Sequence, residues 1–111
     1  MLDKDIRIIE KILHYCNETQ SLISEFKKNN KDYMNDSAFQ LSTDMCIFQI
    51  GELSIHVSEE LKKNNLQIPW AEMRGLRNVH AHEYDNVDRK KMWETLTKDI
   101  PDLAKKLEKL I

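Results

Sequence analysis

The side chains best suited to chemistry are concentrated in one segment, between Ile68 and Tyr84. Within eight residues it contains a cation, an amide, two imidazoles and a phenol: Arg77, Asn78, His80, His82 and Tyr84. Arginine presents a permanent, forked set of donors that matches phosphate oxygens, and histidine titrates near neutral pH and therefore transfers protons. These groups suffice to cut RNA without a metal, because the 2′-hydroxyl is the nucleophile and the protein supplies positioning, proton transfer and charge stabilisation.

Two histidines compete for the role of the proton-transfer group. On an ideal helix His80 lies three residues after Arg77 and shares its face, whereas His82 is five residues away and rotated by about 140°. Helical geometry alone favours His80. If the helix ends between Asn78 and His82, the second imidazole can turn back towards Arg77. The spacing therefore leaves both histidines open.

The whole segment resembles a known family. The string Ile68-Pro-Trp, followed by Gly-Leu-Arg-Asn and by His82-Glu-Tyr84, is similar to HepT-like ribonuclease toxins of the HEPN superfamily. The signature of that family is an arginine, four residues, a histidine, one residue and a tyrosine. Arg77, His82 and Tyr84 fill these positions. Asn78 matches the polar residue that commonly follows the arginine.

The resemblance extends over most of the chain. It includes Gly51-Glu52 and the segment around Trp93 with the late Pro101. It implies an all-helical homodimer, joined through helices near the motif, in which two motifs face a shared cleft. It also implies metal-independent cleavage of RNA, with transfer RNA as one candidate substrate, and inhibition by a nucleotidyltransferase antitoxin of the MntA type.

The resemblance assigns a role to each motif residue. Arg77 would bind and stabilise the scissile phosphate, His82 would transfer protons, and Asn78 would orient the phosphate or His82. The antitoxin would attach AMP to Tyr84, which adds bulk and negative charge where the RNA phosphate must bind. A different class of function stays open: a catalytically silent helical module that uses the same motif to hold a nucleotide or a partner protein.

Three other polar residues are candidates for substrate binding. Arg74 lies three residues before Arg77 and either joins the phosphate site or pairs with an acid. His80 occupies a position that is often apolar in the family. Glu52 forms a polar line with Gln49 and His56 that is suited to face a cleft.

Neither a metal nor a cofactor is expected. His80, His82 and Glu83 have the chemistry of zinc ligands, but their spacing is poor for one helix face. Cys16 and Cys46 fall among apolar residues, where a free cysteine usually behaves as a small hydrophobe. No fourth ligand is evident from these cysteines or from another pair of histidines.

Composition indicates an all-α domain that spans residues 1–111. Only two Gly and two Pro are present, which suits an up-and-down bundle of four to five helices. The net charge of −2 does not indicate coating of DNA or of an anionic membrane. Residues 62–91 hold seven basic and four acidic residues, a local excess that suits a short phosphate site. No apolar run approaches the length of a membrane span, so we expect a soluble, cytoplasmic protein.

The periodicity of apolar residues predicts where the helices lie. The expected elements are a helix over 3–28, a connection over 31–37 with room for one short turn, and a long helix over 38–63. They continue with a third helix from Trp70 to about Asn78 or beyond, a fourth capped by Asp88, and a last one started or kinked by Pro101. The long helix carries two apolar stripes, which imply two packing partners. The second stripe contains Leu41, Phe48 and Ile55 and meets either another subunit or other helices of the chain.

Overall fold

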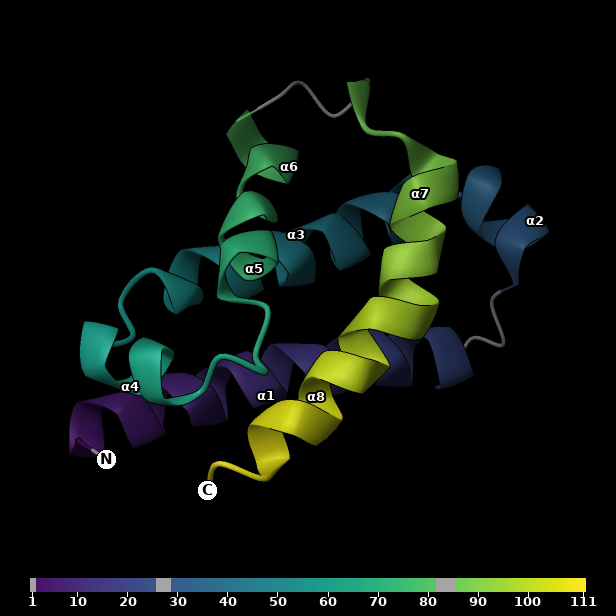
Figure 1. Cartoon of the computed structure of the whole chain (residues 1–111). Coiled ribbons are helices and arrows are strands. Elements are labelled where there is room, and N and C mark those ends of the chain that lie inside the picture. The colour runs from purple at the N-terminus through teal and green to yellow at the C-terminus, as the bar shows by residue number, and fades with distance from the viewer. Residues whose placement is uncertain (1, 26–28, 82–85) are drawn as a thin grey trace.

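The computed structural model describes residues 2–25, 29–81 and 86–111, with the backbone only at residues 80 and 81. The described residues form helices and their connections, and none of them forms a β-strand. This confirms the all-α prediction. Figure 1 shows the longest helices, α1 and α3, lying side by side, with the C-terminal helices crossing over α1.

The first helix, α1 (Asp3–Glu25), forms as its periodicity predicts over all of its described residues. Its buried face carries Ile9, Ile12, Leu13 and Cys16, which pack towards α3 and α8. Ile9, Ile12 or Leu13, and Cys16 follow one another at intervals of three or four residues, so they share one side of the helix.

A short helix, α2 (Asn30–Met34), lies where the sequence predicts a connection. Asn29 caps it, because its side chain accepts a hydrogen bond from the backbone N–H of Asp32 at 2.9 Å. Tyr33 in this helix is completely buried. The segment is therefore a packed element of the fold, which its polar composition conceals.

The long second helix is shorter than predicted. It runs as α3 (Ser37–Ser54), and a separate helix, α4 (Glu59–Asn64), follows after a turn. The prediction of one helix over 38–63 is wrong because Ser58 is drawn out of the helical path. Its N–H donates to Asp5 Oδ1 at 2.9 Å and its hydroxyl to Asp5 Oδ2 at 2.6 Å, while its Oγ caps α4 by accepting from the N–H of Leu61.

The buried Asp5 carboxylate remains charged in this arrangement. Burial by itself raises the pKa of Asp5, but the two hydrogen bonds from Ser58 stabilise the charged form and the net effect is a lowered pKa. The start of α1 is therefore fastened to the start of α4 by a charge-assisted contact between residues that are 53 positions apart.

The predicted third helix is interrupted in its last turn. It forms as α5 (Trp70–Gly75) and α6 (Asn78–Ala81), with a turn at Leu76 and Arg77 between them. The indole N–H of Trp70 donates to the carbonyl of Asn65 at 3.0 Å, which anchors the start of α5.

The C-terminal helices form one continuous rod (Figure 1), made of α7 (Arg89–Glu94), a π-helical turn η2 (Thr95–Asp99) and α8 (Ile100–Glu108). Asp88 caps α7 as predicted, accepting from the N–H of Lys91 at 3.1 Å. Pro101 has no N–H to continue the α-helical ladder, and the N–H of Ile100 instead reaches the carbonyl of Thr95, five residues back. Pro101 therefore adjusts the rod locally without ending it.

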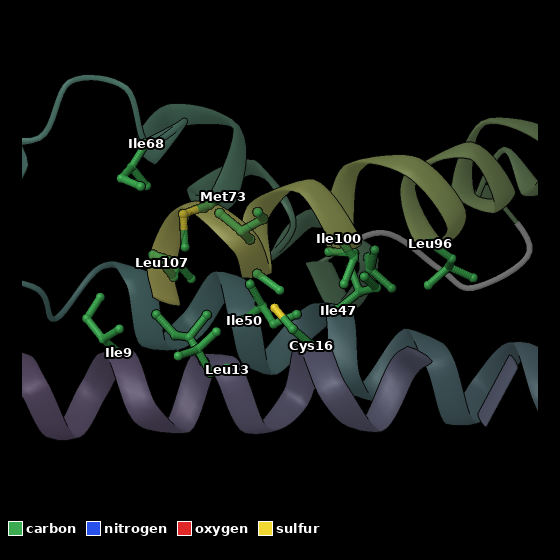
Figure 2. Close-up of a cluster of buried hydrophobic side chains, with 14 of the residues drawn as sticks. Ile9, Leu13, Cys16, Ile47, Ile50, Ile68, Met73, Leu96, Ile100 and Leu107 are labelled. Atoms are coloured by element: carbon green, nitrogen blue, oxygen red, sulfur yellow. The ribbon is translucent and has the colours of Figure 1, made fainter. Parts of the chain in front are cut away.

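The core lies where α1, α3, α5 and α8 meet (Figure 2). Its fully buried side chains include Ile9, Ile47, Ile50, Ile100 and Leu107. Cys16 and Cys46 are free and buried, and burial raises the pKa of Cys16 to about 12 and also raises that of Cys46. Both thiols therefore behave as small hydrophobes. In the described part of the chain, no helix is both long and apolar enough to cross a membrane.

Candidate active site

Gly51 brings the motif segment into backbone contact with α3. A Cβ placed on Gly51 would lie 2.7 Å from the backbone nitrogen of Arg77, and 3.0 Å from both Arg77 Cγ and the carbonyl oxygen of Met73. The first of these distances is shorter than any real Cβ contact, so only glycine permits this packing. The partner in this close approach is the turn that carries the candidate catalytic arginine.

Arg77 is held on α3 by the next residue, Glu52. Arg77 Nε donates to Glu52 Oε2 at 3.1 Å, and the side chains remain 39% and 34% exposed. Within the described residues no hydrogen bond or ion pair involves the two terminal nitrogens of Arg77. The pair therefore fixes the partly exposed arginine through one nitrogen and leaves the fork, which matches phosphate oxygens, without a polar partner among the described residues.

The turn at Leu76 and Arg77 changes the geometry assumed for the two histidines. Arg77 and His80 do not belong to one continuous helix, because α5 ends at Gly75 and α6 begins at Asn78. The expectation that His80 shares a helix face with Arg77 therefore loses its basis. The backbone of His80 lies in α6, and its side chain is outside the described residues, as are His82 and Tyr84.

The remaining sequence candidates flank this turn. Asn78 is exposed at the first position of α6, directly after Arg77, and the buried Val79 behind it fastens α6 to the core. Arg74 is exposed in the last turn of α5 and makes no ion pair with a described residue. Arg77, Asn78 and Glu52 thus come together at one surface, with Arg74 one helical turn before them.

The apolar face of α3 that predicted a second packing partner is exposed beside the site. Leu41 and Met45 are 50% and 52% exposed, and Phe48 and Ile55 are half-buried. At helical spacing Leu41 and Met45 lie on the same line as Glu52. The helix contains no Lys or Arg along its whole length. An uncharged, largely apolar strip therefore leads along α3 to the Arg77–Glu52 pair.

A second arginine, Arg89, also binds α3, although its neighbours in sequence suggest a solvated basic face. Its two terminal nitrogens donate to the carboxylate oxygens of Asp44 at 2.8 and 2.7 Å. One of them also donates to the hydroxyl of Tyr33 at 2.9 Å. Asp44 is 1% exposed and Tyr33 is fully buried, so the cluster is internal. Lys90 and Lys91 are exposed.

The electrostatics of this cluster are those of a permanent ion pair. The hydrogen bonds to Asp44 raise the pKa of Arg89, which keeps the guanidinium charged. Burial raises the pKa of Tyr33, and the donor bond from Arg89 offsets only part of that effect. The sequence gives one signal for this arrangement: a carboxylate at Asp44 among residues that face the core.

The described residues offer neither a second candidate site next to Arg77 nor a metal site. A groove of about 560 Å³ lies between α5 and the C-terminal rod, with Met73, Leu76 and Ile100 among its lining residues, but neither Arg77 nor Glu52 lines it. Among the described residues there is no group of three or more His, Cys, Asp or Glu able to hold a metal ion.

Comparison with known proteins identifies the family. The profile of a family described as "Ribonuclease HepT-like" matches residues 6–110. A protein of Thermococcus cleftensis described as "Probable ribonuclease HepT" is 35% identical over 84% of this chain and 86% of its own length. "Putative RNase MJ1216" of Methanocaldococcus jannaschii is 30% identical over 100% of this chain and 91% of its own. No solved structure gives a significant match. This chain belongs to the HepT-like ribonuclease family.

Proposed function

We propose that this protein is the toxin of a toxin–antitoxin pair, a metal-independent ribonuclease of the cytoplasm that cuts RNA in a cleft between two copies of the chain. The observation that carries the proposal is the state of Arg77. Glu52 holds its Nε, and its forked nitrogens have no polar partner among the described residues, while the side chain stays 39% exposed next to the exposed Asn78. Such a fork is the preferred donor for the oxygens of a phosphodiester.

The proposed reaction uses the 2′-hydroxyl of the substrate as nucleophile. His82 accepts its proton, the 2′-oxygen bonds to phosphorus, and the bond from phosphorus to the 5′-oxygen breaks. The 5′-oxygen takes up a proton, leaving a 2′,3′-cyclic phosphate and a 5′-hydroxyl. Arg77 stabilises the extra negative charge on the phosphoryl oxygens in the transition state, and Asn78 orients the phosphate or His82.

A second copy of the chain is the proposed partner of the exposed α3 face. That face presents Leu41 and Met45 to solvent and contains no Lys or Arg, so it is unsuited to the backbone of RNA. An apolar, uncharged surface is suited to itself, since two copies bury it without opposing like charges. Because Glu52 lies on the same line of α3, pairing through this face would bring the two Arg77 sites to one cleft.

Control by a nucleotidyltransferase antitoxin completes the proposal. Transfer of AMP to the Tyr84 hydroxyl would place a phosphodiester charge two residues from His82 and seven from Arg77. That charge would compete with the RNA phosphate for the same cation, and the added nucleotide would fill the cleft. Tyr84→Phe should therefore remain toxic in the presence of a cognate nucleotidyltransferase.

Growth of expressing cells tests this proposal. Induction of the wild-type chain should arrest growth, Arg77→Ala should relieve the arrest, and Lys105→Ala, a change of an exposed cation on α8, should not. A wild-type chain that is folded and unmodified by intact mass but leaves growth unaffected would contradict the toxin assignment. In that case the catalytically silent binding module becomes the better description.

A further inference from the structure

The segment that carries the motif is fastened to α3 at both of its ends. At the first end, the backbone of Arg77 rests on Gly51 and its side chain pairs with Glu52. At the second, Arg89 begins α7 and pairs with Asp44. Asp44 and Gly51 are seven residues apart, so they lie on one side of α3, two helical turns and roughly 10 Å from each other.

The contact between Arg89 and Asp44 fixes an orientation as well as a distance. Asp44 receives two parallel hydrogen bonds from Arg89, at 2.8 and 2.7 Å, which fix both the distance and the orientation of the guanidinium. Tyr33 of α2 receives a third bond at 2.9 Å, and its ring lies 5.3 Å from that of Trp93 in α7. Contacts with Tyr33 of α2 and Asp44 of α3 therefore fix the position of Arg89 at the start of α7.

Stability alone does not account for this choice of residues. A buried ion pair contributes little more than an apolar pair of the same volume, because removing two charges from water offsets most of their attraction. What the two parallel hydrogen bonds add is a fixed orientation of the Arg89 side chain relative to α3. Arg89 is the first residue of α7, directly after the Asp88 cap, so any rotation or slip at Arg89 also displaces the start of α7 relative to α3.

We propose that Asp44, Arg89 and Tyr33 form a positioning clamp for the ribonuclease site. The clamp fixes Arg89, which follows the motif segment, while Gly51 and Glu52 fix Arg77 at its other end. Both contacts are made with α3, so this one helix sets the distance between Arg77 and Arg89. None of the three residues touches the RNA. The clamp acts by fixing the start of α7 relative to α3, and the inference rests on the proposed roles of Arg77 and His82.

The test separates positioning from stability by replacing the pair with apolar side chains. The double variant Asp44→Leu/Arg89→Met keeps the packing volume and removes both charges together, so its melting temperature should stay within a few degrees of the wild type. Its kcat on RNA should fall by about tenfold or more with little change in KM, because misplaced catalytic groups lower the rate of chemistry more than they lower binding. Wild-type kcat in a folded double variant would overturn the clamp.

If the double variant does not fold, Arg89→Lys decides the question. Lysine keeps the charge but cannot bond both carboxylate oxygens in a fork, so kcat should fall at unchanged KM. Wild-type kcat would again refute positioning. Lys106→Met is the matched control, since it breaks the exposed Lys106–Asp102 pair of 3.0 Å on α8 and should leave kcat unchanged.

Two further variants keep the two hypotheses apart. His82→Ala tests the proposed function itself, because wild-type cleavage by His82→Ala would remove the catalytic role on which the clamp depends. Loss of cleavage in His82→Ala together with wild-type kcat in Asp44→Leu/Arg89→Met would refute the clamp alone. Tyr33→Phe should lower kcat by less than the double variant, since it removes one hydrogen bond and keeps the ring contact with Trp93.

Discussion

Replacing Gly51 by alanine should damage the active site far more than it damages the fold. The added Cβ would lie 2.7 Å from the backbone nitrogen of Arg77, and an ordinary contact begins at 3.4 Å, so the turn must retreat by about 0.7 Å. The obstacle is backbone and cannot rotate away. Displacement of a catalytic group by about 1 Å lowers the rate by roughly a hundredfold, so we expect a loss of about 10- to 100-fold in kcat/KM for Gly51→Ala.

The expected change in stability is smaller because two effects oppose each other. Overpacking costs about 1–3 kcal/mol, while alanine in place of glycine within a helix contributes about 1 kcal/mol. The net loss in the free energy of unfolding should therefore be about 0–2 kcal/mol, a decrease of several degrees in melting temperature.

Gly75→Ala is the matched control, since a Cβ there meets no atom within 4 Å among the described residues beyond its chain neighbours and its own helix. It should keep wild-type kcat/KM and gain up to about 1 kcal/mol of stability. Steady-state cleavage of a short RNA and thermal unfolding of the three proteins supply the data. Equal kcat/KM for Gly51→Ala and the wild type would refute the reasoning, because it would mean that the position of Arg77 does not limit catalysis.

Three other perturbations test separate parts of the account. Glu52→Gln should cost under about 1 kcal/mol in urea unfolding, since the pair is partly exposed. It should reduce cleavage several-fold, because the neutral amide holds Arg77 less firmly than the carboxylate does, and unchanged cleavage would remove Glu52 from the site. Leu41→Glu/Met45→Glu should yield a folded monomer by light scattering, and a dimer of undiminished mass would exclude this face as the interface. Folding lowers the pKa of Asp5, so the charged Asp5 stabilises the fold fully above about pH 4, and this contribution is lost as the pH falls below that value. The difference in the free energy of unfolding between the wild type and Asp5→Asn should therefore shrink in acid. A difference independent of pH would contradict the charged contact.

The helices that depend on local pattern are predictable from the sequence. Apolar spacing in α1, the Asp88 cap of α7 and the position of Pro101 each act within a few residues, and the structure agrees with all three. Gly51 is also informative by itself, because a glycine inside an apolar helix signals a close neighbour. The sequence indicates the contact but not that its partner is the backbone of Arg77.

The features that sequence reasoning missed depend on pairs that are distant along the chain. Ser58 leaves the helical path because of Asp5, 53 residues earlier, and Arg89 is buried by Asp44, 45 residues earlier. The chain has many acidic residues, and without the fold nothing indicates that Asp5 is the partner of Ser58 or that Asp44 is the partner of Arg89. At the interruption before Arg77 the one local signal is Gly75, a poor helix former at the last position of α5, and a single glycine does not show whether the chain turns there or continues as a helix.

Three of the sequence candidates, Arg77, Asn78 and Glu52, lie at one surface of the described structure, and their role in catalysis stays a prediction. The contact between Glu52 and Arg77 joins residues 25 positions apart, which no local pattern indicates. The choice between His80 and His82 stays a prediction, because their side chains lie outside the described residues.

The most direct test of the central claim is cleavage of RNA by purified wild-type and His82→Ala protein in the presence of a chelator, with analysis of the product ends. Unmodified mass and a folded state are first verified for both proteins. We predict that the wild type cleaves and leaves a 2′,3′-cyclic phosphate, while His82→Ala remains folded and does not cleave. Wild-type activity in His82→Ala, or cleavage that the chelator abolishes, would contradict it.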